Sequence, residues 1–432
     1  MIYKMILQDR NGNLVDNFYN SHKNIMINEF GSLLIRKEQT IPYKSFHKVS
    51  PETPGRKGKI STLKIQLGLK CNYSCSYCLQ SSELPDANVT SNSDTRSFID
   101  SISKWLTVPP KRIEFWGGEP FVYWSKLKIL VPELRNMFPK AEFLIITNGS
   151  LLDEEKIQFI CDYDILIGMS HDGPQQKYRG PDPFRDEKTF ATIKSLMDRR
   201  PGKVSFNIVL HAKNYDLEAI YNWFDEKFPN PNLTLEGIVS TYDDYTLKNI
   251  GQFTKQQYNE LVNNVFYELT VKRTRFKSLS MKLDSFIESL RQQIPINMLH
   301  QRCGMDKEDM IAVDLQGNVM TCQNTGSKGN HKIGSVYDYE NIKLDTSTHL
   351  SFREECTHCP VVQLCKGGCM YLQNDYFTQS CWNEYYYNLG VFKAALFFLT
   401  GRILIKLEGD IRRPTYSDSV IQKYPQLSEL YQ

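Results

Sequence analysis

The sequence lacks an excess of charge of either sign, and it lacks an apolar N-terminal run. Its 432 residues hold 52 Lys and Arg against 49 Asp and Glu, a net charge of +3, which gives no reason to expect a nucleic-acid partner. The first ten residues, MIYKMILQDR, place Asp9 and Arg10 where a secretion signal needs its hydrophobic stretch. We therefore expect no secretion signal and a reducing, cytoplasmic location.

A long uninterrupted hydrophobic run is also missing. The most hydrophobic stretch, from Tyr385 to Ile405, is about as long as a membrane span, but Asn388, Lys393 and Arg402 interrupt it. Because charged side chains at the centre of a bilayer are costly, the stretch is expected to be a buried helix with no membrane contact.

The 11 cysteines are an odd number and cannot form a closed set of intrachain disulfides. Four fall in the first 300 residues, and seven lie between Cys303 and Cys381. A chain of this length does not depend on disulfides for stability. We therefore expect reduced thiols with metal or redox roles, and a separate metal-binding segment in the C-terminal third.

Short apolar runs alternate with amphipathic ones after Ser61, a pattern that predicts six β-α repeats in a parallel barrel or an open parallel sheet. The six candidate strands read LKIQLGL, RIEFWGG, AEFLIITNG, ILIGMSHDG, VSFNIVLH and LTLEGIVS. Before them, alternating residues around Asn11-Gly12 predict a β-hairpin, followed by the basic linker SPETPGRKGK. After them, residues 254–293 contain no Gly or Pro and predict a helical connector.

The first 70 residues hold 12 Lys and Arg against 5 Asp and Glu, a net charge of +7. Such an excess is either a solvated basic face or a docking surface for an acidic partner or peptide. The sequence leaves both interpretations open.

Three cysteines follow the first predicted strand directly. Cys71, Cys75 and Cys78 have the spacing C-x3-C-x2-C, which suits three irons of a four-iron cluster and leaves the fourth iron without a protein ligand. A zinc site usually has four ligands, and no fourth Cys or His lies nearby in the sequence. Catalytic residues of β/α barrels lie on loops after the strands, as these do.

This motif resembles the signature of radical S-adenosylmethionine (SAM) enzymes, and the ends of the next strands are similar to that family as well. The resemblance implies that the open iron chelates SAM, whose reductive cleavage gives a 5'-deoxyadenosyl radical that abstracts hydrogen from substrate. It also implies a set of SAM contacts in the GGEP, TNG and S-x-D-G-P segments and beside them. These candidates are Tyr77, Gly117, Gly118, Glu119, Asn148, Ser170, Arg179 and Asn207.

The C-terminal cysteines resemble the seven-cysteine SPASM domain of one branch of that family. The resemblance assigns one auxiliary 4Fe-4S cluster to Cys356, Cys359, Cys365 and Cys381. It assigns another to Cys303, Cys322 and Cys369, which leaves that cluster one cysteine short. With the SAM-binding cluster this makes three 4Fe-4S clusters. Cys161 is left over and is expected to be a buried, inert thiol. A pair of zinc knuckles is the alternative interpretation of these spacings.

The resemblance implies an α/β fold: a partial (β/α)6 barrel, a small Cys-rich SPASM domain and an N-terminal β-rich extension. The expected boundaries are 1–60 for the hairpin-containing extension, 61–253 for the barrel, 254–299 for the helical connector, 300–385 for the SPASM domain and 386–432 for the C-terminal helix and tail.

The branch includes enzymes that crosslink ribosomally made peptides through carbon-carbon or thioether bonds, and anaerobic sulfatase maturases. Sulfatase maturases generally have an Asp after the cysteine that corresponds to Cys322, but Gln323 occupies that position here. We therefore expect a peptide-crosslinking maturase. The alternatives are a radical SAM dehydrogenase or epimerase, and a non-catalytic zinc-binding or RNA-binding protein. The implied partners are a peptide or protein substrate, a flavodoxin or ferredoxin as low-potential donor, and a leader-recognition module that is reduced, separate or absent.

Overall fold

The structure is a computed structural model, and it describes residues 1–38, 59–82, 90–273, 275–328, 331–344 and 348–431. Most of the basic linker expected at 50–59 lies outside these ranges. The chain forms two compact units. Unit 1 consists of Met1–Lys48, Val209–Cys303 and Thr348–Gln432, and unit 2 of Val49–Ile208 and Gly304–Ser347. The boundaries expected from the sequence remain predictions.

Unit 2 is built on a mixed sheet with the order β12-β11-β10-β4-β5-β6-β7-β8. Strands β4 to β8 are parallel neighbours, β10 joins the edge parallel to β4, and β11 and β12 run antiparallel. Their bounds are β4 Thr62–Gln66, β5 Arg112–Trp116, β6 Glu142–Thr147, β7 Ile165–Ser170, β8 Val204–Leu210, β10 Met310–Asp314, β11 Asn318–Met320 and β12 Lys332–Ser335. The α/β fold expected from the sequence is confirmed.

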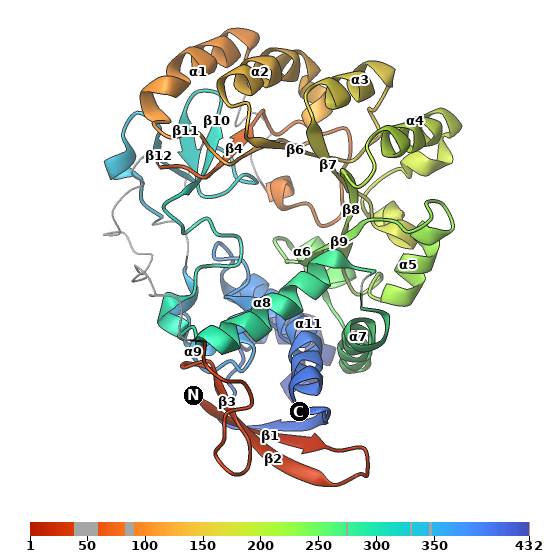
Figure 1. Cartoon of the computed structure of the whole chain (residues 1–432), viewed down its shortest axis with the longest axis vertical. Helices are drawn as coiled ribbons and strands as arrows, with labels where there is room; N and C mark the ends of the chain where they lie inside the picture. Colours follow the sequence, from red (N-terminus) through yellow and green to blue (C-terminus); the bar gives the residue numbers. More distant parts are fainter. Residues whose placement is uncertain (39–58, 83–89, 274, 329–330, 345–347, 432) are drawn as a thin grey trace. The chain divides into compact units, whose positions relative to one another are not determined.

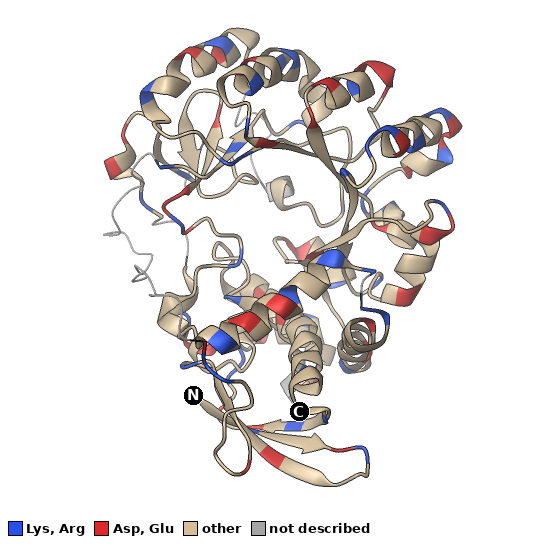
Figure 2. Cartoon of the chain, viewed as in Figure 1, with Lys and Arg blue, Asp and Glu red and all other residues tan. Residues whose placement is uncertain are grey.

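Four helices lie on one face of this sheet (Figure 1). They are α1 Asn92–Trp105, α2 Trp124–Met137, α3 Glu154–Asp162 and α4 Glu187–Arg199. Each of these helices buries apolar side chains. Helix α1 begins at a capping box, in which Ser91 and Asp94 exchange hydrogen bonds between side chain and backbone. Charged residues of both signs lie along these helices (Figure 2). This face therefore shows no excess of one charge.

Unit 1 contains the sixth expected strand and the expected helical connector. The sixth strand is β9 Leu233–Ile238. The helices of unit 1 are α5 Leu217–Asp225, α6 Asp244–Thr246, α7 Lys255–Tyr267, α8 Lys277–Gln292, α9 Glu354–Thr357, α10 Val362–Cys365, α11 Asn374–Thr400 and α12 Asp418–Lys423. The connector is less regular than its composition suggests, because a π-helical turn at Glu268–Lys272 ends α7 and leads to Arg273, whose φ is +53°.

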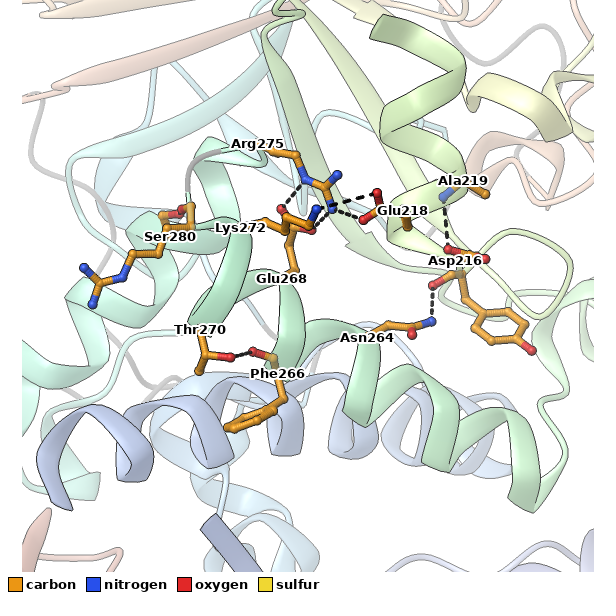
Figure 3. Close-up of polar contacts among 12 residues, drawn as sticks. Asp216, Glu218, Ala219, Asn264, Phe266, Glu268, Thr270, Lys272, Arg275 and Ser280 are labelled. Carbon is orange, nitrogen blue, oxygen red and sulfur yellow. Dashed lines mark hydrogen bonds and ion pairs between the residues drawn. The ribbon is translucent and has the colours of Figure 1, made fainter. Parts of the chain in front are cut away.

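Arg275 forms ion pairs with two glutamates beside the break between α7 and α8. Its guanidinium contacts Glu268 at 2.5 Å and Glu218 at 2.6 Å, and Lys272 lies 3.9 Å from Glu218 (Figure 3). The Glu268 side chain is only 3% exposed. The cation of Arg275 thus compensates a buried carboxylate at the point where the helix changes direction.

The N-terminal hairpin is confirmed, with an addition from the other end of the chain. Strands β1 (Ile2–Gln8) and β2 (Leu14–Asn20) pair antiparallel, and β3 (Ile25–Ile27) follows β2. Strand β13 (Ile403–Glu408) pairs with β1 and completes the order β13-β1-β2-β3. The expected buried helix at Tyr385–Ile405 is therefore correct only to Thr400, where α11 ends at Gly401 with φ +68°. Helix α11 packs against α7 and α8.

None of the helices in the described ranges combines the length and apolar character that a membrane crossing requires.

Candidate active site and auxiliary cysteine site

The loop after β4 carries the first three cysteines. Cys71 is exposed, and Cys75 and Cys78 are half-buried. The backbone folds around them: the amide of Tyr73 donates to the Cys71 sulfur at 3.3 Å, and the amide of Cys78 donates to the Cys75 carbonyl at 3.1 Å. The loop thus leaves β4 and turns tightly at the C-terminal end of the parallel strands, where α/β proteins build their sites.

The end of β5 holds this loop through two glycines. The Gly118 amide donates to the Gly68 carbonyl at 3.0 Å, and the Glu119 amide donates to the Lys70 carbonyl at 3.0 Å. A Cβ at Gly118 would lie 2.3 Å from the Lys70 oxygen, and one at Gly117 would lie 2.9 Å from the Gly68 oxygen. The GGEP segment therefore needs glycine because two backbones meet there without room for a side chain.

Glu119 joins the ends of two strands from a buried position. Its carboxylate accepts hydrogen bonds from the Phe121 amide at 3.0 Å, the Thr147 hydroxyl at 2.7 Å and the Asn148 amide at 2.7 Å. Burial raises the pKa of Glu119 to about 7, although the three donors oppose this shift. The carboxylate thus holds the end of β6 against the end of β5.

Asn148 extends the same bracing to the cysteine loop. Its side-chain amide donates to the Asn72 side-chain oxygen at 2.9 Å, and Asn72 donates in turn to the Ser150 hydroxyl at 2.8 Å. The TNG segment after β6 therefore contacts the residue that directly follows Cys71.

The end of β7 contributes a buried charged group that the sequence interpretation missed. Tyr77 donates a short hydrogen bond to Asp172, and the Arg179 guanidinium lies 2.9 Å from the same carboxylate. Arg179 also lies over the Tyr77 ring, 5.6 Å from its centroid. Asp172 is fully buried. The S-x-D-G-P motif contained this residue, but only the folded chain shows that it links Tyr77 to Arg179.

Ser170 and Asn207 are neighbours across the β7 and β8 pair. Both are buried, and Ser205 donates to the Asn207 side-chain oxygen at 3.2 Å. All eleven residues named from the first motif and its companions therefore belong to unit 2, on its parallel strands β4 to β8 or on the segments that follow β4 to β7.

The electrostatics of the loop favour a cationic occupant. Burial raises the pKa of Cys75 to about 12, with Arg179 lowering it and the thiolates of Cys78 and Cys71 raising it further. Iron binds cysteine in its thiolate form. Three cysteines on one loop at the ends of the parallel strands, two of them half-buried, therefore suit an iron-sulfur cluster.

A second set of cysteines lines one cavity in unit 1. The cavity is bounded by Cys356, Cys359, Cys365, Cys369 and Cys381, with Glu355, Tyr385 and Arg413 among the remaining lining residues. Burial raises the pKa of Cys356, and the charges of Cys381, Cys365 and Cys359 raise it further. Burial likewise raises the pKa of Cys381 to about 11. Buried thiols this close together suit a multinuclear cluster.

Cys303 and Cys322 belong to different units. Cys303 is exposed at the end of a segment of unit 1, and Cys322 follows β11 in unit 2. Gln323 lies beside the first parallel strand: its side-chain oxygen accepts from Lys64 at 3.2 Å, and its carbonyl accepts from Gln66 at 2.6 Å. Its amide cannot act as a base.

All 11 cysteines lie in the described residues, and none of them is in a disulfide there. Cys161 on α3 is half-buried rather than buried, which corrects the expectation for this residue. Within the described ranges no three His, Cys, Asp or Glu side chains converge on a position for a single metal ion. That finding concerns mononuclear sites, because a 4Fe-4S cluster distributes its thiolates over separate irons.

Comparison with known proteins identifies the surroundings of the first cysteine motif. Residues 65–224 match the radical SAM superfamily. The chain is 22% identical over 413 residues to the radical SAM cyclopropyl synthase TigE of Paramaledivibacter caminithermalis, covering 85% of this chain and 82% of that protein. It is 25% identical over 330 residues to a cysteine-type anaerobic sulfatase-maturating enzyme of Clostridium perfringens, covering 69% and 85%.

A solved structure agrees at the level of the fold. Native anSMEcpe with bound AdoMet and Cp18Cys peptide superposes with a TM-score of 0.57 at 20% identity, over 79% of this chain and 98% of that one.

Proposed function

Because this chain is a radical SAM enzyme, we propose that it is a peptide maturase that uses SAM to abstract hydrogen from a residue of a ribosomally made peptide and leads to an oxidative crosslink. The crosslink is a carbon-carbon or thioether bond. Two relatives support this proposal: a cyclopropyl synthase that matches 85% of the chain, and a fold relative that binds a peptide together with AdoMet.

The observation that carries the proposal is the bracing of the cysteine loop by the ends of three further parallel strands. Cys71, Cys75 and Cys78 would hold a 4Fe-4S cluster, which together with bound SAM supplies a 5'-deoxyadenosyl radical. The chain's own contribution is to fix the loop. Gly118 holds it from β5, Asn148 from β6, and Asp172 from β7 through Tyr77.

The proposed SAM contacts surround this loop. Gly117, Gly118 and Glu119 would bind the amino end of SAM, and Tyr77 would lie against the adenine. Asn148, Ser170, Arg179 and Asn207 complete the proposed set. Glu119 already accepts three hydrogen bonds, so its role is first to fix the strand ends on which the other contacts depend.

A crosslink formed after hydrogen abstraction is a net oxidation, which requires an electron acceptor. We propose that auxiliary clusters fill this role. Cys356, Cys359, Cys365 and Cys381 line one cavity and would hold one of them. The assignment of a further auxiliary cluster to Cys303, Cys322 and Cys369 stays a prediction, as does the total of three clusters.

The proposed partners follow from the same chemistry. Reductive cleavage requires a low-potential donor such as flavodoxin or ferredoxin, in a cytoplasm that keeps the 11 thiols reduced. A leader-recognition module that is reduced, separate or absent stays a prediction.

The second candidate function is oxidation of a sulfatase residue, favoured by the relation to a sulfatase-maturating enzyme. Gln323 argues against it, because its amide accepts a hydrogen bond from Lys64 and takes no proton. The two functions are separated by anaerobic assays with two peptides: a precursor encoded beside this gene and a cysteine-containing sulfatase peptide. The proposal expects a crosslink by tandem mass spectrometry in the first. Formylglycine in the second, with the first unchanged, would overturn it.

A further inference from the structure

The segment after β13 crosses the cysteine-lined cavity of unit 1. On one side the Arg412 amide donates to the His358 carbonyl at 3.4 Å, and the Arg412 side chain pairs with Glu354. On the other side the Trp382 indole donates to the Pro414 carbonyl at 3.1 Å. This tail, residues 409–417, is therefore attached both to the segment that carries Cys356 and Cys359 and to helix α11.

Docking of the tail continues beyond the cavity. The Tyr416 hydroxyl donates to the Gln379 side-chain oxygen at 2.7 Å, and the Ser417 amide donates to Asp375 at 2.7 Å. These contacts lie along the first turns of α11, the helix that carries Cys381. The tail is thus held in a fixed position on the wall of the cavity.

Arg413 is the tail residue that lines this cavity. Its Nη2 donates to the Cys359 sulfur at 3.3 Å, and its guanidinium lies 3.8 Å from the centroid of the Tyr385 ring. Its Nε is buried and has no hydrogen-bond partner in the structure. A buried, unpaired donor of a cation is costly, so the site is incomplete as a purely protein environment.

The charge of Arg413 acts on the cysteines. Burial lowers the pKa of Arg413, but the thiolates of Cys359 and Cys381 outweigh this and leave the pKa above its ordinary value. A guanidinium within hydrogen-bond distance of the Cys359 sulfur favours the anionic, metal-binding form of a thiol.

We propose that Arg413 is a positioning residue for the auxiliary cluster of Cys356, Cys359, Cys365 and Cys381. Its Nη2 donates to the Cys359 sulfur, and its Nε–H would be left to donate to the cluster that these cysteines would hold. This inference rests on the proposed function, which places a cluster in this cavity.

The positive charge has a redox consequence. A cluster that accepts an electron becomes more negative, and a buried cation beside it stabilises that reduced form. Arg413 thus raises the reduction potential of the cluster and favours acceptance of an electron. The C-terminal tail thereby contributes to the redox chemistry as well as to the fold.

The test uses the full chain with Cys71, Cys75 and Cys78 changed to Ala, so that no SAM-binding cluster contributes to the spectrum. In this background Arg413→Leu, Arg413→Lys and Arg412→Leu are compared by iron content and by redox titration monitored by electron paramagnetic resonance. Arg412→Leu is the matched control, because it removes a charge from the same tail without contacting a cysteine. Arg413→Leu is expected to lower the ratio of reduced to oxidised cluster at least tenfold at a fixed potential. For a one-electron couple, a tenfold change corresponds to a reduction potential lower by about 59 mV.

Arg413→Lys keeps the charge and is expected to show a smaller change, and Arg412→Leu none. If Arg413→Leu loses the iron while Arg413→Lys retains it, the inference also holds, because the charge then keeps the cluster in place. An unchanged potential and iron content in Arg413→Leu would overturn the inference, as would equal iron loss in all three variants, since that indicates general undocking of the tail. If the background chain itself carries no auxiliary cluster, the proposed function fails instead.

Discussion

Gly118 sets how closely the end of β5 approaches the cysteine loop. Gly118→Ala places a Cβ 2.3 Å from the Lys70 carbonyl, so the loop must move. Overpacking of this kind costs about 1–3 kcal/mol. We expect the variant to lose SAM cleavage and the iron of the first cluster, measured as 5'-deoxyadenosine formed and iron per chain.

Gly202→Ala is the matched control for that substitution, because nothing lies within 4 Å of its Cβ position. Its φ of +72° makes alanine cost about 1 kcal/mol there, without touching the loop. If Gly202→Ala and Gly118→Ala lose iron to the same extent, the loop is not held in the way proposed.

Glu119 is expected to make the free energy of unfolding of the metal-free chain depend on pH. Its folded pKa of about 7 lies above the ordinary value of 4.5, so the folded state binds this proton more tightly. The resulting stabilisation is complete below pH 4.5 and is lost as the pH rises to about 7. Glu119→Gln does not titrate, so the urea midpoint of the unsubstituted chain should fall relative to that of the variant across this range.

The variant has a second expected effect, because a Gln amide cannot accept from both sides as the carboxylate does. One donor is left unpaired, at a cost of about 1–3 kcal/mol. A midpoint difference between the two chains that stays constant from pH 4.5 to 7 would contradict the assigned pKa of Glu119.

At the residue scale, the sequence predicted which residues carry the chemistry better than it predicted which side chains contact one another. Spacing singled out Cys71, Cys75 and Cys78, and the resemblance to radical SAM enzymes singled out Gly117 and Gly118. Asp172 was not chosen, because its role depends on Tyr77, which lies 95 residues away in the chain. The free Nε of Arg413 is likewise a property of the folded cavity.

At the scale of elements, the break between α7 and α8 depends on one arginine. Arg275→Met removes the cation from Glu268, whose side chain is 3% exposed, and should lower the free energy of unfolding by about 3 kcal/mol. Chemical denaturation followed by circular dichroism measures this change. Figure 3 shows the group of residues involved.

Two further variants separate the effect of burial on stability from the effect of losing a charge. Lys272→Met removes a cation 3.9 Å from Glu218, but both side chains are at least 36% exposed, so the expected loss is under about 1 kcal/mol. The pair Glu268→Leu with Arg275→Met removes both charges and should recover much of the stability. Equal losses in Lys272→Met and Arg275→Met would show that burial of Glu268 has no energetic consequence.

Elements were predictable from periodicity where they are long or repeated. All six strands β4 to β9 and the helices α1 to α5 appear where the alternation of apolar and amphipathic runs placed them. Strands β10 to β13 were not anticipated. Strands β11 and β12 are short, and β13 and β10 depend on pairing with β1 and β4 from distant parts of the chain. Such partners leave no local pattern.

At the scale of the whole molecule, the two compact units do not follow the order of the chain. Unit 1 joins three separate segments and unit 2 joins two. The cysteine-rich segment contributes β10 to β12 to the sheet of unit 2 and the cavity of five cysteines to unit 1. Composition identified that segment as metal-binding, but only long-range strand pairing and packing divide it between units.

The central claim is that Cys71, Cys75 and Cys78 form the site of SAM cleavage. The most direct test is 5'-deoxyadenosine production under anaerobic, reducing conditions by the unsubstituted chain and by the variant with all three cysteines changed to Ala. Iron counted in the same samples reports whether the auxiliary clusters remain. We expect cleavage by the unsubstituted chain with about twelve irons, and no cleavage by the variant with about eight irons retained. Cleavage that survives the triple substitution would contradict it.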